Sequence, residues 1–146
     1  MTASTTEEIR VGSISIRFLV EGEQTAESIA VFEFGVPAGA KVPAGHSHDR
    51  YEETIYGLEG ALTWTIDGTT SEIGPGETVF IPRGTVHRFD NTGDVDAKAL
   101  AIVTPGVLGA GYFRDVAAVL DSSAGGPPDL AAVAAVMRRH GLTPAP

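Results

Sequence analysis

The octet HSHDRYEE, residues 46–53, contains two of the four histidines in this 146-residue chain and ends in two adjacent carboxylates. In an extended strand, side chains two positions apart point to the same face, so we predict that His46 and His48 project together. Glu53 begins the next predicted strand and would face both imidazoles across a hairpin, with Glu52 as the competing carboxylate. The octet is therefore either a metal site or a polar loop.

A second stretch, GETVFIPRGTVHRFDN (76–91), supplies a third imidazole and favours the metal site. Its Pro82 and Gly84 predict a turn, and His87 begins the strand that follows. Imidazole and carboxylate together suit one divalent transition metal ion, either Fe, Mn, Ni, Cu or Zn, and the ligand types do not choose between these metals. Such a site keeps open coordination positions for a substrate, water or dioxygen. The predicted metal ligands are His46, His48, Glu53 and His87.

Short strand-like segments follow one another from residue 8 to about residue 104. In residues 13–20 and 29–36, apolar and polar positions alternate with the period of a half-buried strand. Asp67-Gly68 is typical of a two-residue hairpin turn, which needs positive φ at both positions. Closely spaced short strands with such turns indicate an antiparallel sandwich or barrel. The other strand-like segments are 61–66, 78–82 and 99–103.

Near residue 104 the apolar positions change to helical spacing. One predicted helix carries Phe113, Val116, Ala117 and Leu120, and SSAGGPP (122–128) ends it. A second helix is predicted over 129–140, before Gly141. We therefore divide the chain into a disordered N-terminus (1–7), a β-barrel (8–104) and a helical C-terminal tail (105–146) packed on the barrel. Whether this tail is also a lid or a dimer contact stays open.

The spacing of the two histidine-bearing stretches is specific. After His46-Ser47-His48, four residues precede Glu53, and six more precede Gly60. The second stretch has matching positions at Gly76, Pro82, Gly84, His87 and Asn91. Together these spacings resemble the two sequence motifs of the cupin superfamily. The one departure is an extra residue between Gly39 and His46, which leaves open how Val42 and Ala44 face.

Within this superfamily, the chain resembles small single-domain bacterial cupins of the quercetin-dioxygenase-like, cupin-2 conserved barrel type. This resemblance implies a mainly β fold, namely a double-stranded antiparallel β-helix (a jelly-roll or cupin barrel), here with a C-terminal two-helix tail. It also implies a homodimer. An N-terminal strand such as residues 13–20 would then pair across the interface, because an apolar strand edge needs covering.

Cupins with this ligand set have several activities, so three functions stay open. The first is a small metal-dependent dioxygenase that acts on an apolar, phenolic or enolic small molecule, with Glu53 as a ligand and possible general base. The second is a redox-free, metal-assisted isomerase, cyclase or lyase. The third is a small-ligand-binding protein without turnover. Candidate substrate-pocket residues are Tyr51, Phe89 and Phe32, whereas Phe34 and Trp64 are expected to pack in the core.

Composition argues against other classes of partner. A net charge of -9 gives an acidic surface that repels phosphate backbones, so no nucleic acid is expected. No apolar run approaches the roughly 20 residues of a membrane span, and the polar start of the chain lacks the pattern of a signal peptide. The absence of cysteine excludes disulfides and thiolate metal sites. We expect a cytoplasmic protein in which His140, at a helix end, is structural.

Overall fold

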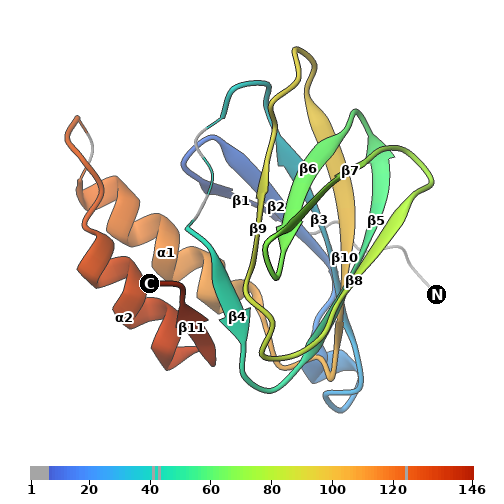
Figure 1. Ribbon diagram of the computed structural model, residues 1–146. Helices are drawn as coiled ribbons and strands as arrows, with labels where there is room; N and C mark the ends of the chain where they lie inside the picture. Colours follow the sequence, from blue (N-terminus) through green and yellow to red (C-terminus); the bar gives the residue numbers. More distant parts are fainter. Residues whose placement is uncertain (1–6, 41, 43, 124) are drawn as a thin grey trace.

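The computed structural model describes residues 7–40, 42, 44–123 and 125–146, and this part of the chain forms two antiparallel sheets and two α-helices (Figure 1). In spatial order, the six-stranded sheet consists of β1 (Glu8–Val11), β2 (Ile14–Val20), β3 (Ala30–Val36), β10 (Ala97–Thr104), β5 (Glu52–Glu59) and β8 (Thr78–Ile81). The five-stranded sheet consists of β11 (Leu142–Pro144), β4 (His46–His48), β9 (His87–Asp90), β6 (Leu62–Ile66) and β7 (Thr69–Ile73). The predicted mainly β, antiparallel jelly-roll fold is confirmed.

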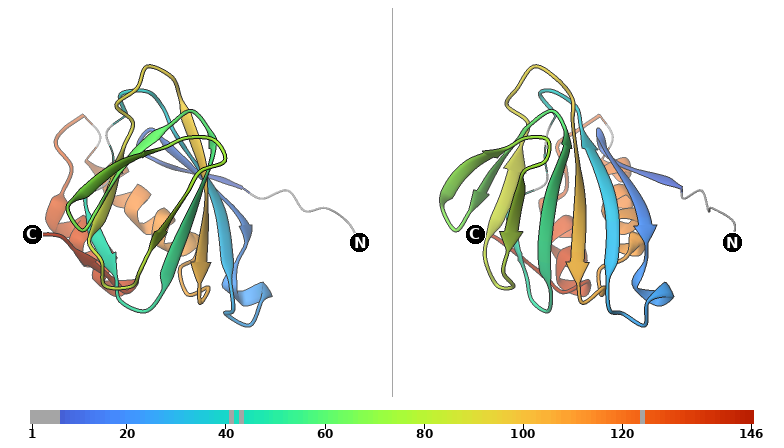
Figure 2. Two further views of the ribbon diagram at one scale, coloured as in Figure 1. Left: turned by 45° about the vertical axis from the view of Figure 1, so that its right-hand side comes forward. Right: turned by 90° about the vertical axis from the view of Figure 1, so that its right-hand side faces the viewer.

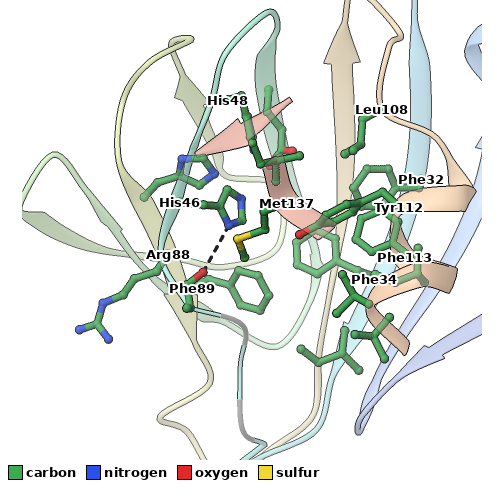
Figure 3. Close-up of a pocket in the computed structure, with 18 of the residues that line it drawn as sticks. Phe32, Phe34, His46, His48, Arg88, Phe89, Leu108, Tyr112, Phe113 and Met137 are labelled. Atoms are coloured by element: carbon green, nitrogen blue, oxygen red, sulfur yellow. Dashed lines mark hydrogen bonds between the residues drawn. The ribbon is translucent and has the colours of Figure 1, made fainter. Parts of the chain in front are cut away.

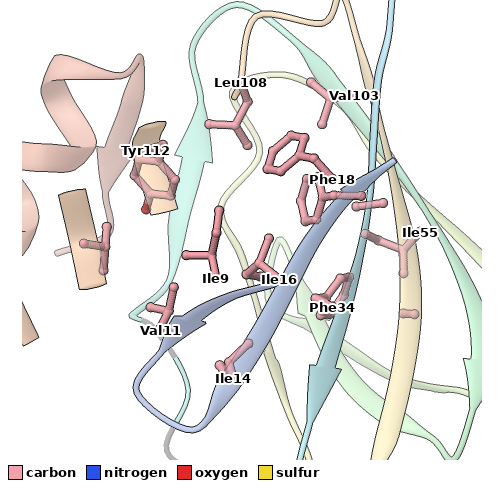
Figure 4. Close-up of a cluster of buried hydrophobic side chains, with 14 of the residues drawn as sticks. Ile9, Val11, Ile14, Ile16, Phe18, Phe34, Ile55, Val103, Leu108 and Tyr112 are labelled. Carbon is pink, nitrogen blue, oxygen red and sulfur yellow. The ribbon is translucent and has the colours of Figure 1, made fainter. Parts of the chain in front are cut away.

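Side chains alternate between the two faces of each strand, and this alternation decides which of them form the core. In β2, Ile14, Ile16 and Phe18 are buried, and the intervening Arg17 is exposed. Register pairs Ile16 with Phe34 and Phe18 with Phe32, so the apolar faces of β2 and β3 form one continuous layer (Figure 4). Burial of such side chains is the main force that holds the two sheets together.

The polar strand β7 is held by its turn rather than by burial. Its residues are largely exposed, and it pairs with β6 across Asp67-Gly68. These two residues have φ of 49° and 79°, as the hairpin turn predicted from the sequence requires.

The helices α1 (Ala110–Ser122) and α2 (Leu130–Arg139) lie together on one side of the barrel (Figures 1 and 2). A short 3-10 turn, η1 (Gly22–Gln24), follows β2. Asp129 caps α2 by accepting a hydrogen bond from the Ala132 N–H at 3.0 Å. Side chains on both helices join the hydrophobic core, among them Val116 and Met137. In the described residues, no helix has the length and apolar character that crossing a membrane requires.

Two expectations about the chain's ends need correction. The C-terminal tail is not only helical: it ends in β11, which pairs residue by residue with β4. The strand expected to pair across a dimer interface already has neighbours, because β1 covers Ile14–Arg17 and β3 lies on its other side. A homodimer stays a prediction, but residues 15–17 of this segment are already paired on both sides and supply no free edge for it. Most of the N-terminus predicted to be disordered, residues 1–6, lies outside the described residues.

Candidate metal centre

Three imidazoles from two neighbouring strands meet inside the barrel. His46 and His48 lie two residues apart on β4, and His87 on β9 stands opposite His46 in the strand register. One ring nitrogen from each lies within 4.8 Å of the other two. Metal–nitrogen distances of about 2.0–2.1 Å separate two nitrogens on one ion by up to about 4 Å, so small ring adjustments suffice to place all three on one ion.

Hydrogen bonds leave a free nitrogen on each ring. The Nδ1 atoms of His46 and His87 lie 3.3 Å and 2.9 Å from the carbonyl oxygens of Ala44 and Thr85. With Nδ1–H donating to those carbonyls, both Nε2 lone pairs are available to an ion. The Nδ1 of His48 is buried and has no hydrogen-bond partner among the described residues. A buried polar atom without a partner is costly, and a cation in the cavity is one way to satisfy it.

The histidines are held neutral, which metal binding requires. Burial lowers the pKa of His46 to about 3 and that of His48 to about 2, with a further lowering by the charge of His87. Burial also lowers the pKa of His87. At neutral pH all three rings therefore keep a lone pair for an ion.

Glu53 lies in the same cavity but outside this group of three imidazoles. It is only 7% exposed, and burial raises the pKa of its carboxyl to about 8. The adjacent Glu52 points to the rim and pairs with Arg83. The structure thus favours Glu53 over Glu52 as the inward carboxyl, and it brings together three of the four predicted ligands.

The other motif residues shape the backbone around the site. The Gly84 N–H donates to the His48 carbonyl at 2.8 Å, which ties the turn before β9 to the strand β4. Gly60 has φ of +60°, and a Cβ there would lie 2.4 Å from the Asp96 carbonyl oxygen, so a side chain is excluded. Asn91 donates to the carbonyls of Val36 and Val95, both at 2.9 Å. These residues therefore shape the backbone around the site.

The last residues of the chain hold the strand that carries two of the histidines. β4 pairs with β9 through one residue pair, His46 with His87. On its other side, β11 pairs with all of β4, and further hydrogen bonds extend this ladder at both ends. The Thr143 hydroxyl also donates to the Asp49 carboxylate at 2.7 Å. The sequence gives no sign of this support, because LTP (142–144) is too short to show a strand pattern.

A cavity of about 90 Å³ opens beside the imidazoles (Figure 3). This volume exceeds the roughly 10–15 Å³ that one water requires, so the site has room for a small organic molecule. Two of the three candidate pocket residues, Phe32 and Phe89, line this cavity. Phe34 and Trp64, for which core packing is the expectation, line it too. Val42 packs on the core and Ala44 borders the cavity.

Tyr51 is not among the residues that line this cavity. It is fully buried, and its ring stacks on that of His48 with 4.2 Å between centroids and 21° between planes. Burial and the charge of Glu53 raise the pKa of Tyr51 well above its ordinary value. The Tyr51 ring therefore supports the His48 imidazole from the side away from this cavity.

The C-terminal tail forms part of the cavity wall. The sequence alone does not show whether the tail has a role beyond packing on the barrel. Its contributions come from the segment before α1, both helices and β11; the residues are Leu108, Tyr112, Phe113, Val116, Val133, Met137 and Leu142. His140, expected to be structural, hydrogen-bonds through Nε2 to the Asp115 carboxylate at 2.9 Å and so joins the end of α2 to α1. The apolar faces of the helices were visible in the sequence, but their place over the cavity was not.

Comparisons with known proteins agree with this geometry. The sequence family described as Cupin domain (Cupin_2) matches residues 32–103. Quercetin 2,3-dioxygenase of Bacillus subtilis is 31% identical over 78 residues, which are 53% of this chain and 22% of that protein. An uncharacterized protein of Methanocaldococcus jannaschii is 39% identical over 70 residues, 48% of this chain and 55% of that protein. The matches thus span about half or less of these curated relatives.

Among solved structures, the polyketide cyclase RemF from Streptomyces resistomycificus superposes with a TM-score of 0.60 at 26% identity. The superposition covers 75% of this chain and 86% of that one. The similarity therefore extends over most of both molecules.

Proposed function

Because this chain is a cupin over residues 32–103, we propose that it is a small metal-dependent dioxygenase acting on an apolar, phenolic or enolic molecule. The observation that carries this proposal is the convergence of three neutral imidazoles beside a buried carboxyl group in an aromatic-lined cavity. The similarity to quercetin 2,3-dioxygenase supports oxygen-dependent chemistry. Since the match covers 22% of that enzyme, the activity itself remains our proposal.

The residues present fit a divalent metal, and His46, His48 and His87 would hold it, with Glu53 as the fourth candidate ligand. When bound, the ion would supply Lewis acidity and, if redox-active, electron transfer to dioxygen. Glu53 is suited to accept the proton of a phenolic or enolic hydroxyl. Its pKa of about 8 lies close to neutral pH, and a nearby cation lowers that pKa and favours the carboxylate. Phe32, Phe34 and Phe89 exclude water from this proton transfer.

A redox-free, metal-assisted cyclase is the second candidate. Its support is the similarity to the polyketide cyclase RemF, which covers more of both chains than the dioxygenase match does. In this case Glu53 would move a proton within the substrate and no oxygen would be consumed. The two candidates share the ligands and the cavity, so oxygen consumption separates them.

Elemental analysis by plasma mass spectrometry tests the metal site, on untagged wild type and two variants. We expect about one transition metal per chain in the wild type. His48→Ala should lose it, because even outer-shell changes weaken metal sites by about 10- to 100-fold. The matched control His140→Ala removes a histidine outside the cluster and should keep the metal.

Oxygen-uptake assays with phenolic and enolic compounds then test the reaction. Uptake that depends on the metal and is lost in His48→Ala supports the dioxygenase. Turnover without oxygen uptake favours the cyclase class. A wild type that takes up no metal, even after reconstitution, overturns both and leaves a small-ligand-binding protein.

A further inference from the structure

Among the described residues of the C-terminal tail, Tyr112 is the one polar side chain in the cavity wall. It lies on α1 and is only 5% exposed. In Figure 3 its ring lies beside Phe32, Phe34 and Phe113, and its hydroxyl points into the cavity, toward the side where Met137 and His46 lie. The other polar groups of the cavity come from the barrel.

No described residue hydrogen-bonds to the Tyr112 hydroxyl, and this oxygen stays accessible to the cavity, unlike the fully buried and partnerless hydroxyl of Tyr51. Most buried polar groups in proteins are hydrogen-bonded, and an unpartnered one calls for an explanation. Tyr56, by comparison, is 40% exposed and reaches solvent. A hydroxyl that faces an apolar cavity beside a candidate metal centre is available to a ligand bound there.

The position of Tyr112 is fixed by contacts on either side of it along α1. The Glu21 carboxylate accepts a hydrogen bond from the Ala110 N–H at 3.1 Å, which anchors the start of α1. One turn after Tyr112, Asp115 pairs with His140 at the end of α2. The ring itself packs edge-on against Phe113, with 5.0 Å between centroids. A donor held in this way loses little conformational entropy when it binds a ligand.

We infer that the Tyr112 hydroxyl donates a hydrogen bond to an oxygen of the bound small molecule. This inference rests on the proposed function and narrows the substrate class. The molecule would be an aromatic or enolic compound with one oxygen directed to the three imidazoles. A second oxygen, of a carbonyl, enolate or phenolate, would accept from Tyr112, and the remaining apolar surface would contact the phenylalanines of the wall.

The protonation state of Tyr112 agrees with a donor role. Burial, and then the charge of Glu53, raise the pKa of Tyr112 above its ordinary value. The phenol therefore keeps its proton at neutral pH.

The test compares wild type, Tyr112→Phe and the matched control Tyr56→Phe, each loaded with Zn²⁺. The probe is 4-nitrocatechol, whose absorption changes on deprotonation, and 4-nitrophenol serves as the analogue with one phenolic oxygen. Zn²⁺ affinity is measured separately by competition with a chelator. The readouts are the two probe affinities, the pKa of the bound nitrocatechol and the Zn²⁺ affinity.

We expect Tyr112→Phe to bind 4-nitrocatechol about five- to tenfold more weakly, the loss of one hydrogen bond. The pKa of the bound probe should rise by up to about one unit. Binding of 4-nitrophenol should change less. That difference between probes within one variant distinguishes a lost contact from a general loosening of the pocket. Zn²⁺ affinity, and all values for Tyr56→Phe, should stay within about twofold of the wild type.

Three outcomes would overturn the inference. In the first, Tyr112→Phe binds both probes as the wild type does. In the second, it weakens both probes equally or weakens Zn²⁺ binding, which would make Tyr112 a packing residue. In the third, the Zn²⁺-loaded wild type binds no nitrocatechol. A wild type that binds no Zn²⁺ would instead show that the proposed function has failed, and the chelator competition detects this independently.

Discussion

The barrel and the C-terminal tail both line the cavity with apolar side chains, but they contribute different polar groups to it. The barrel supplies the three imidazoles and Glu53, which are the groups that can bind an ion. The tail supplies apolar side chains and one phenol, Tyr112. We infer that metal binding depends on the barrel, whereas the fit of a small molecule depends on both segments. We expect them to respond separately to mutation, except where the tail touches β4.

That exception is β11, where the tail becomes part of the sheet that carries the histidines. Backbone hydrogen bonds join Asp49 to Gly141 and Ala145 to Gly45, both at 2.9 Å. Along an antiparallel ladder, hydrogen-bonded residue pairs alternate with pairs that are not hydrogen-bonded. Thr143 and Ser47 lie midway between the two bonded pairs above, so they also form a hydrogen-bonded pair. Pro144 falls on an alternate position that needs no N–H, which explains how an edge strand tolerates it.

The largest expected effect comes from Thr143→Pro, which removes the backbone donor to Ser47. We expect Zn²⁺ affinity to fall about 10- to 100-fold, because β4 would lose the backbone pairing with β11 that positions His46 and His48. Chelator competition measures this loss. Ligand binding could then be altered without metal binding only through the helices of the tail, because β11 would be needed for the metal site.

Thr143→Ala is the matched control. It removes the hydroxyl contact with Asp49 but keeps the backbone ladder, so Zn²⁺ affinity should stay within about threefold of the wild type. If Thr143→Pro binds Zn²⁺ as tightly as Thr143→Ala does while remaining folded, β11 has no part in positioning the histidines.

Val133→Phe tests whether a change in α2 weakens ligand binding and leaves metal binding unchanged. Val133 lies on α2, is partly buried and lines the cavity, so a larger ring there would occupy space that a ligand needs. We expect binding of 4-nitrocatechol to the Zn²⁺-loaded protein to weaken at least about tenfold, with Zn²⁺ affinity unchanged. Absorbance titration and chelator competition measure the two quantities.

The matched control for this variant is Ala135→Phe, which places the same ring on an exposed position of the same helix. It should leave both affinities unchanged. A parallel loss of Zn²⁺ and probe binding in Val133→Phe would show that α2 and the imidazoles are coupled, contrary to the separation inferred here.

The difference between the barrel and the C-terminal tail also explains which features could be predicted from the sequence. The spacing of His46 and His48 predicts a shared face, because strand geometry alone decides it. The turn at Pro82–Gly84 and the strand after it place His87 in the same way. These are local rules applied to a recognisable motif, and the structure brings the three rings together.

The tail offers no comparable local rule. The position of Tyr112 over the cavity depends on how α1 packs on the barrel, which helical periodicity does not specify. β11 is three residues long and contains a proline, so its pattern is too short to detect. Tyr51 was expected in the pocket because it lies near the histidines in sequence, but its ring instead stacks on the imidazole of His48. In each case a tertiary contact decided the outcome.

The smallest expected effect concerns the number of ligands that the barrel provides. In the metal-free protein the pKa of Glu53 is about 8, above its ordinary 4.5, so this carboxyl is protonated at pH 7. The histidines, with pKa values lowered to about 3 for His46 and about 2 for His48, carry no proton to release. If Glu53 binds the ion, Zn²⁺ must displace its proton, and about 0.9 proton per ion should be released at pH 7.

Calorimetric titration with Zn²⁺ in buffers of different ionisation enthalpy measures this release. The same linkage predicts that Zn²⁺ affinity rises by up to about tenfold per pH unit below pH 8 and then levels off, because above pH 8 the carboxylate is already ionised. Glu53→Gln should release no proton and lose this slope, whereas Glu52→Gln, which alters the partner of Arg83 at the rim, should keep both. A wild type that releases no proton would show that the three imidazoles bind the ion without Glu53. The carboxyl would then be left free to act as a base.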